Sequence, residues 1–544
     1  MFHFDSSPIL FTMRHSLLVK RLARPQEPEA EMAPAKRTSS PPELQKQVNA
    51  FLNVDVDVKV LQHIINLFTK LNVSAIGEMY VTEVIFKNLL KRKCIYGSDT
   101  DQIKPNPKPN AKTKAKLKQM AKENKPNGLF LKYYNDEWSK LLIHLASSAK
   151  DVSAVALNVC MQFILAESKY AKLNAQPHER LRIMLQSIIT SETTPPAALV
   201  AFEKYARCLD ILQLAYQVLP ELAPVSFVDS PNEALNYLAI INSLDLSKTV
   251  LSANKYHLTE TNPNRNFEYE ETRKHLNSVW NGIIARCSDL DEKVHRQVLV
   301  VLLERIFPHL DEPILLTDFL MNSLHQFDGP VALLALQGIF KLMQEQNITY
   351  PDVYQKLYNM FYPRMFYNKY KARLFYLADI FLTSTHLPEN LVAAFVKRLA
   401  RLALKSPTED AIILIRFVCN LLLRHTGLQR LICATDAASA VEISDPYDER
   451  ELDPVKTGAL NSSLWEMLLL QKHAVPEVAN AARFISKSLP VFEFDLGPLL
   501  EIKECDIFDD EVKKMMKQFA LSYDRPANFG LPQNDIVTKY WDII

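Results

Sequence analysis

The sequence predicts an all-α protein built as a HEAT- or armadillo-like helical-repeat solenoid. Only 10 of its 544 residues are glycine, whereas average composition contains about 7 %. Hairpins and phosphate-binding loops rely on glycine for positive φ angles, so its scarcity disfavours sandwiches, barrels and nucleotide-binding α/β folds. Apolar residues recur three and four apart in segments of roughly 12–20 residues, as on one face of a helix. Adjacent segments form pairs that repeat at roughly 35–45 residues, which suits stacked helical pairs.

Charge and cysteine usage exclude several classes of protein. The formal net charge is +1, so any contact with nucleic acid has to come from a local basic patch. The seven cysteines are odd in number and have no C-x-x-C spacing, which disfavours zinc sites and secreted disulfide scaffolds. The uncharged stretch 152–166 is shorter than the roughly 18–20 apolar residues that span a bilayer. We expect a core helix there and no membrane association.

The first elements in chain order are a polar segment and a series of helices. Residues 1–42 are largely polar and carry several prolines, so we expect a disordered N-terminal segment, with Met1, Met13 or Met32 as the start. Residues 43–329 should form the N-terminal helical repeats. The periodicity predicts helices near 57–71, 75–93, 129–147, 151–170, 178–190, 197–217, 231–243, 270–286, 291–307 and 312–325.

A lysine-rich loop at about 97–127 interrupts these repeats. Its run "KPNPKPNAKTKAKLKQMAKENK" spans 104–125. Lysines that neutralise phosphates release counterions and give sequence-independent affinity for RNA, so Lys112, Lys114, Lys116 and Lys118 are candidate RNA contacts. A nuclear localisation signal and a solvated loop are the alternatives, and the sequence does not separate the three.

The C-terminal half should continue as helices near 329–345, 351–361, 370–383, 389–404, 407–424, 463–474 and 477–488. The segment 362–381 interleaves aromatic residues with arginines and lysines, a pattern that can stack bases and hold phosphates. A helix with one face in the core gives the same pattern, and we favour that interpretation.

Lys397, Arg401 and Lys405 follow one another at four-residue spacing, so they share one face of their helix. This row is either a solvated face or a site for an acidic partner segment or RNA phosphate. The next helix, 407–424, is apolar nearly all round and should be buried on every side. Ser406 and Glu409 predict a capping box at its start, and Gly427 is a candidate for the residue that ends it.

The stretch "DPYDERELDPVKTGALNSSLWE" opens with five acids at 445, 448, 449, 451 and 453. Prolines interrupt the acids and no glycine lies between them, so the frame of a calcium-binding loop is absent. We expect an acidic loop that leads into a helix, with Ser463 and Glu466 forming a second capping box. Asp448, Glu449 and Glu451 are candidates for binding a basic partner.

Nothing in the sequence indicates an enzyme. Walker loops, G-x-S-x-G and H-E-x-x-H are absent. We therefore expect no catalytic, metal or cofactor-binding residues, no bound cofactor and no small-molecule substrate.

The residues from "YKARLFYLADIF" to "SSLWEMLLLQKHAVPEVANAA" resemble the CCAAT-binding-factor (CBF) domain family. The ordered signature D-P-Y, D-P, A-L and S-S-L-W-E carries this resemblance, which covers about 330–510 and leaves 511–544 as a C-terminal tail. The resemblance implies a non-enzymatic nucleolar and nuclear ribosome-assembly scaffold in 40S biogenesis. It also implies a role in 18S rRNA maturation within the small-subunit processome. The implied partners are a larger nucleolar protein, Nop fourteen, and other small-subunit processome proteins. The lysine loop does not match the family pattern, and only its charge makes it a candidate contact for pre-rRNA.

Two other functions fit parts of the sequence. The CBF name suggests a sequence-specific transcription factor, although no helix-turn-helix or zinc-finger pattern supports it. The helices alone also fit a solenoid transport receptor.

Overall fold

A computed structural model describes residues 46–50, 58–70, 74–96, 128–147, 149–170, 176–192, 195–253, 255–258, 267–287, 290–346, 350–433, 445–518 and 540. Within these ranges every regular element is a helix and none is a strand, so the all-α prediction is confirmed. The HEAT-like class stays a prediction. The predicted N-terminal segment 1–42 and the lysine-rich loop at 97–127 lie outside the described residues.

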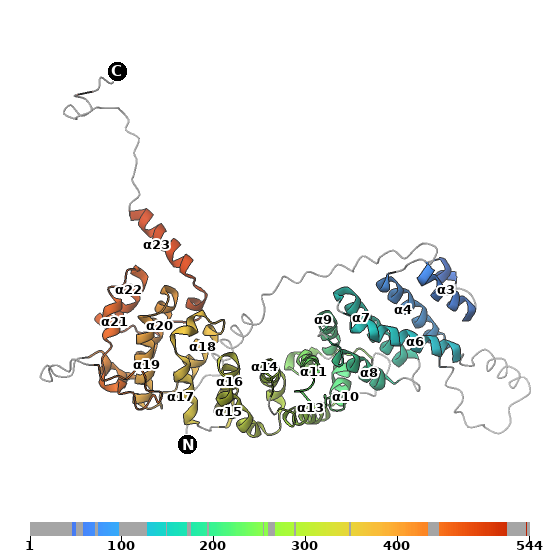
Figure 1. Cartoon of the computed structure of the whole chain (residues 1–544), viewed down its shortest axis with the longest axis horizontal. Coiled ribbons are helices and arrows are strands. Elements are labelled where there is room, and N and C mark those ends of the chain that lie inside the picture. Colours follow the sequence, from blue (N-terminus) through green and yellow to red (C-terminus); the bar gives the residue numbers. More distant parts are fainter. Residues whose placement is uncertain are drawn as a thin grey trace, which may run out of the picture. The chain divides into compact units, whose positions relative to one another are not determined.

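The chain divides into two compact units, Met1–Asp311 and Glu312–Ile544. The sequence had placed the boundary between the repeats and the CBF-type region at 329/330, one helix later. The helices of the first unit are α3 (Val58–Lys70), α4 (Ala75–Lys91), α6 (Gly128–Leu145), α7 (Lys150–Tyr170), α8 (Pro177–Ile189), α9 (Pro196–Ala206), α10 (Leu209–Val218), α11 (Pro231–Ser243), α12 (Lys248–Ala253), α13 (Tyr269–Ile284) and α14 (Glu292–Val301), followed by a π-helical turn, Leu302–Ile306 (Figure 1).

Helix α7 forms the core of the first unit's N-terminal part. It packs against α4, α6, α8 and α9. The rings of Phe86, Tyr134 and Phe163 meet there, with centroids 5.4–6.2 Å apart. By length and composition α7 is the one described helix that could span a membrane. Most of its apolar residues are buried, as predicted for the core helix at 152–166.

The single helix expected at 197–217 is two helices, so that prediction was wrong. Cys208 takes an extended conformation between α9 and α10. The segment 255–258 occupies the break: Leu209 N donates to Lys255 O, and the Asp210 carboxylate accepts from the backbone amides of His257 and Leu258. A contact with a segment distant in sequence therefore breaks a helix that local periodicity would continue.

The second unit contains α15 (Thr317–Gln326), α16 (Gly329–Gln346), α17 (Pro351–Met360), α18 (Lys371–Phe381), α19 (Glu389–Ala403), α20 (Thr408–Arg424), α21 (Trp465–Leu470), α22 (Pro476–Ala482) and α23 (Glu504–Gln518), with short 3₁₀ turns between several of them. Helix α23 crosses the predicted boundary at 510/511, so the predicted tail begins inside a helix. Figure 1 shows α18 to α22 gathered together in this unit.

Helix α20 lies at the centre of the second unit, in contact with α19, α22 and two 3₁₀ turns. Its residues are buried on all sides, as predicted. The predicted capping box is wrong, because Pro407 is the N-cap and no side chain bonds to the first turn. Glu409 instead accepts from Lys371 on α18, and Ser406 Oγ donates to Ala403 O. Gly427 lies within a 3₁₀ turn rather than at a left-handed helix end.

Candidate functional site

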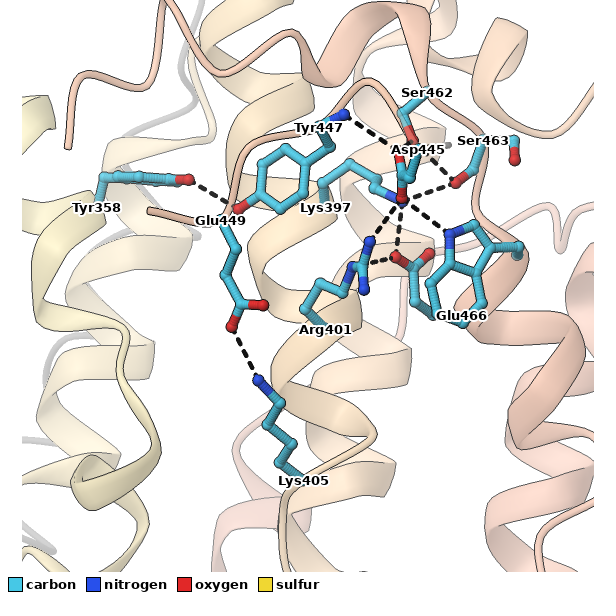
Figure 2. Close-up of polar contacts among 11 residues, drawn as sticks. Tyr358, Lys397, Arg401, Lys405, Asp445, Tyr447, Glu449, Ser462, Ser463 and Glu466 are labelled. Atoms are coloured by element: carbon cyan, nitrogen blue, oxygen red, sulfur yellow. Dashed lines mark hydrogen bonds and ion pairs between the residues drawn. The ribbon is translucent and has the colours of Figure 1, made fainter. Parts of the chain in front are cut away.

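The acidic stretch and the basic row on α19 lie against each other. Lys397 and Arg401 project from α19 toward Asp445 and Glu466, which lie at opposite ends of the segment 445–466 (Figure 2). Two cations therefore face two carboxylates. The sequence offered Lys397 and Arg401 as partner-binding candidates, but the fold pairs both with Asp445 and Glu466, which were not among those candidates.

Lys397 is the centre of this cluster. Its side chain is 0 % exposed. Its ammonium donates to Asp445 Oδ2 at 3.0 Å, Ser463 O at 2.8 Å and Glu466 Oε1 at 2.6 Å. An ammonium has three donors and no acceptor, so these three bonds use its full capacity. A buried charge needs this kind of pairing, because leaving it unpaired away from water is costly.

Asp445 holds the entry to the acidic stretch. Its Oδ2 accepts from Lys397, from Arg401 Nη2 at 2.7 Å and from Trp465 Nε1 at 2.8 Å. Its Oδ1 accepts from Ser462 Oγ and from the backbone amide of Tyr447 at 3.1 Å. Burial alone would raise the pKa of Asp445, but these donors outweigh it and hold the pKa well below its ordinary value. The carboxyl is thus ionised at neutral pH.

Glu466 forms the other end of the cluster and is 0 % exposed. Its Oε1 lies 2.6 Å from Lys397 Nζ and 2.8 Å from Arg401 Nε. Burial raises the pKa of Glu466, and hydrogen bonding and charge from Lys397 oppose that rise. The guanidinium of Arg401 lies over the Trp465 ring, 4.6 Å from its centroid. Such a cation–π contact adds to the ion pairs, so Trp465 both packs and donates.

Tyr447 makes a second connection between the segment and the helices. Its hydroxyl lies 2.8 Å from the hydroxyl of Tyr358 on α17, and both side chains are buried. Arg398 lies 4.4 Å from the centroid of the Tyr358 ring and donates to Phe361 O at 2.7 Å. The D-P-Y part of the family signature therefore fixes the loop to α17 as well as to α19.

The remaining acids shape the loop itself. Three of the four accept from the backbone amide two residues further on: Asp448 from Arg450 at 2.9 Å, Glu451 from Asp453 at 3.0 Å and Asp453 from Val455 at 3.0 Å. Asp448 N donates to Thr457 O at 2.9 Å and closes the loop. Local bonds of this kind are typical of acidic residues in turns, so most of these acids determine the backbone path.

The outer part of the loop is exposed. Glu449 and Lys405 form an ion pair at 2.9 Å with exposed fractions of 44 % and 53 %. Leu452 is 60 % exposed and Val455 is 50 % exposed. We call residues 448–456, most of which are at least partly exposed, the loop crest. It combines two apolar side chains with exposed carboxylates.

One sequence-based interpretation of this region changes. Ser463 and Glu466 do not form a capping box, because Leu464 is the N-cap of α21 and no side chain bonds to that helix end. Glu466 is turned toward α19, where two cations hold it. In the part of the chain that the structure describes, no group of three or more His, Cys, Asp or Glu side chains is arranged to hold a metal ion.

The predicted site residues therefore fall into three groups. Lys397 and Arg401 are drawn into the buried cluster, whereas Lys405, Asp448 and Glu449 stay at the surface, with Glu451 half-buried. Their roles in partner binding stay predictions. The four candidate lysines at 112, 114, 116 and 118 lie outside the described residues.

Sequence reasoning missed that Asp445 and Glu466 are the partners of this cationic row. One signal was available: Lys397 is surrounded on its helix by Ala393, Ala394 and Ala400, all 0 % exposed. Small apolar residues three and four positions away mark a face that packs closely. A lysine on such a face needs a buried counter-charge.

The chain is similar to known proteins over most of its length. The CBF/Mak21 family model matches residues 332–482, which confirms the resemblance found in the signature residues. Nucleolar complex protein 4 homolog B of Xenopus laevis is 31 % identical over 477 residues, covering 85 % of this chain and 88 % of that protein. Homolog A of the same species is 34 % identical over 426 residues, with coverages of 75 % and 80 %. The Homo sapiens homolog is 33 % identical over 381 residues, with coverages of 67 % and 72 %.

Proposed function

Because this chain belongs to the family of nucleolar complex protein 4 homologues, we propose that it acts in the nucleolus as a non-enzymatic scaffold of ribosome biogenesis. More specifically, we propose that it acts in assembly of the small (40S) subunit. There it supports 18S rRNA maturation within the small-subunit processome. It does so through a stable complex with a larger nucleolar partner of the Nop-fourteen type.

The contacts that the signature residues make within the second unit support a scaffold role. Asp445, Trp465 and Glu466 are bound by one another or by Lys397 and Arg401. A catalytic acid or base has to reach a substrate atom, and here the charged groups are engaged inside the unit. Their effect is to fix a loop onto α19 and present its crest, which is what a binding module requires.

The loop crest is the surface we propose for the partner. Leu452 and Val455 supply exposed apolar anchors, and Glu449 supplies an exposed carboxylate beside them. A partner segment with apolar side chains flanked by lysine or arginine would bury the anchors and pair with the carboxylate. Interfaces of this kind draw most of their affinity from a few buried anchors.

Depletion of the chain from cells tests this role. Pulse-labelled rRNA should show accumulation of 18S precursors and loss of mature 18S rRNA, with large-subunit rRNA continuing to form. Re-expression of the wild-type chain should restore 18S rRNA, which is the matched control. Loss of large-subunit rRNA with normal 18S production would contradict the proposed small-subunit role.

A further inference from the structure

The segment 362–381, which interleaves aromatic and cationic residues, is split by the fold into two parts. Its second part is α18, whose apolar residues lie in the core as predicted. Its first part, residues 362–370, is a turn that carries Tyr367 with an exposed fraction of 83 %. We call these residues the tyrosine turn. The core interpretation thus accounts for α18 and leaves the tyrosine turn unexplained.

The tyrosine turn is rigidly held. Met365 and Phe366 are 0 % and 5 % exposed and anchor its 3₁₀ helix, Pro363–Tyr367, in the core. Backbone bonds from Met365 N to Tyr362 O at 3.0 Å and from Asn368 N to Met365 O at 3.1 Å close it. An aromatic ring on such a support loses little conformational freedom when it binds, which favours affinity.

The tyrosine turn ends against the start of α16. Asn368 Nδ2 donates to the Tyr370 hydroxyl at 2.7 Å. The Tyr370 ring lies about 3.6 Å from the Cβ position of Gly329, which has a φ of +64°. Burial, the Tyr362 hydroxyl and the Asp328 carboxylate raise the pKa of Tyr370 to about 12. Tyr370 is therefore neutral at physiological pH and adds no negative charge.

Two cations flank the exposed ring. In a 3₁₀ helix side chains three residues apart eclipse one another, so Arg364 and Tyr367 share one face. The side chains of Arg364 and Lys369 are both exposed. Neither forms an ion pair or hydrogen bond with another described residue. The sequence "YPRMFYNKY" contains no acidic residue, and the neighbouring Asp328 is paired with Lys356 at 2.8 Å.

We propose that the tyrosine turn is a binding site for single-stranded RNA, with a base stacked on Tyr367 and the flanking phosphates held by Arg364 and Lys369. Base–aromatic stacking beside a cationic track is the general means by which proteins hold unpaired strands. This inference deepens the proposed function, because it assigns to the second unit a direct contact with the RNA of the assembling particle.

The surroundings of Tyr367 favour RNA over a protein partner. Hot spots for protein partners lie in pockets that a ring of neighbouring contacts seals from water. The exposed neighbours of Tyr367 in the sequence include the cations Arg364 and Lys369, beside Tyr362 and Pro363. Exposed aromatic rings between cations match a polyanion whose bases are free to stack.

Fluorescence anisotropy with the purified full chain and a labelled oligouridine of about 12 nucleotides tests the site. In this experiment every chain, the reference included, carries glutamine in place of the four candidate lysines 112, 114, 116 and 118. RNA binding by the lysine-rich loop then does not mask binding at the tyrosine turn. We expect Tyr367→Ala to weaken binding by about 5- to 100-fold, and Tyr367→Trp to retain it. The double variant Arg364→Gln/Lys369→Gln should lower the salt slope by about 1.4, at about 0.7 per phosphate.

Phe492 supplies a matched control, because it is 82 % exposed in the same unit and is followed by Glu493. Phe492→Ala should leave oligouridine binding unchanged. In a second readout, 4-thiouridine RNA should crosslink to the tryptic peptide Met365–Lys369, which contains Tyr367, and the Tyr367→Ala variant should lose that adduct.

Two results would overturn the proposal. One is unchanged affinity of Tyr367→Ala with no adduct on the peptide. The other is normal RNA binding by Tyr367→Ala together with loss of a nucleolar protein partner, which would make the tyrosine turn a protein site. The nucleolar role is tested by rRNA production in cells, whereas the RNA site is tested by the affinity of the purified protein. Either proposal can therefore fail without the other.

Discussion

The ammonium of Lys397 lies 2.6 Å from the Glu466 carboxylate at a place where neither side chain is exposed. This pair joins α19 to the start of α21 across the acidic segment. It also accounts for the signature by which the family is recognised, because the S-S-L-W-E residues surround it. The charged residues of the segment are therefore largely structural, and only the loop crest is left for a partner.

Replacing Lys397 by Met should strongly destabilise the second unit. The change keeps the approximate length of the side chain and removes its charge. Of the two cations in the cluster, Arg401 then remains to pair with Glu466 and Asp445. Breaking a buried ion pair in this way costs about 3–5 kcal/mol. The free energy of unfolding can be measured in urea from the 19F NMR signal of Trp465 in a 5-fluorotryptophan-labelled chain.

The control for this variant is Lys405→Met, two residues beyond the end of α19. The Lys405–Glu449 pair is about half exposed, and such surface pairs contribute about 0–1 kcal/mol. Equal losses in the two variants would show that burial of Lys397 is not what makes its pairing important.

The stabilising effect of Asp445 should depend on pH. Its donors hold the folded-state pKa below the ordinary value near 3.9. Its stabilisation is therefore fully present above about pH 4 and is lost as the pH falls from there toward the folded pKa. Asp445→Asn should lower the free energy of unfolding at pH 7, and its difference from wild type should shrink between about pH 4 and pH 2.

The same 19F signal of Trp465, followed in urea at several pH values, measures this difference. Glu466 is present in both chains, so its own titration contributes to both curves. A deficit of Asp445→Asn that stays constant from pH 7 to pH 2 would mean that the ionised carboxylate is not the stabilising form.

Gly458→Ala should destabilise the loop that closes the segment. Gly458 has a φ of +71°, and an added Cβ would lie 2.6 Å from the backbone oxygen of Pro446. Strain at a left-handed position alone costs about 1–3 kcal/mol, and the close approach to a backbone atom adds to it. Urea unfolding should show this loss. Gly128→Ala is the control, since its Cβ would meet nothing within 4 Å, and a loss of similar size there would remove the basis of the prediction.

A charge change at the loop crest should weaken partner capture without unfolding the chain. Glu449→Lys/Leu452→Asp is suited to this test, because the Glu449 carboxylate accepts from exposed Lys405 and Leu452 is 60 % exposed. Reversing Asp448 and Glu451 as well would remove bonds that shape the turn. We expect at least about a fivefold loss of affinity for the co-purified nucleolar partner, since loss of an anchor costs more than about 1 kcal/mol.

The control for the loop crest is Lys456→Gln, which removes an exposed charge that is paired with Asp453. It should leave partner recovery near wild type. Unchanged recovery with Glu449→Lys/Leu452→Asp, in a chain that unfolds at the wild-type urea concentration, would exclude the crest as the binding surface.

The sequence predicted the elements whose determinants are local. Periodicity located most described helices, and the all-round apolar pattern of 407–424 identified the central helix of the second unit. The four-residue spacing of Lys397 and Arg401 placed them on one face. It could not show what that face meets, because Asp445 and Glu466 reach it from 48 and 69 residues away.

The failures have the same physical origin. Ser463 and Glu466 fit a capping box locally, but two cations on α19 offer Glu466 stronger contacts than a backbone amide does. The periodicity of 197–217 fits one helix, but residues 255–258 bind at the break and favour two. In each instance a contact between distant segments outweighs the local preference.

Affinity purification of the tagged chain followed by RNA crosslinking tests the central claim, that this protein is a nucleolar scaffold of small-subunit assembly. We predict recovery of small-subunit precursor rRNA, processome proteins and a larger partner of the Nop-fourteen type. Recovery of promoter DNA with little pre-rRNA, or of transport cargo released in a Ran-dependent manner, would contradict it.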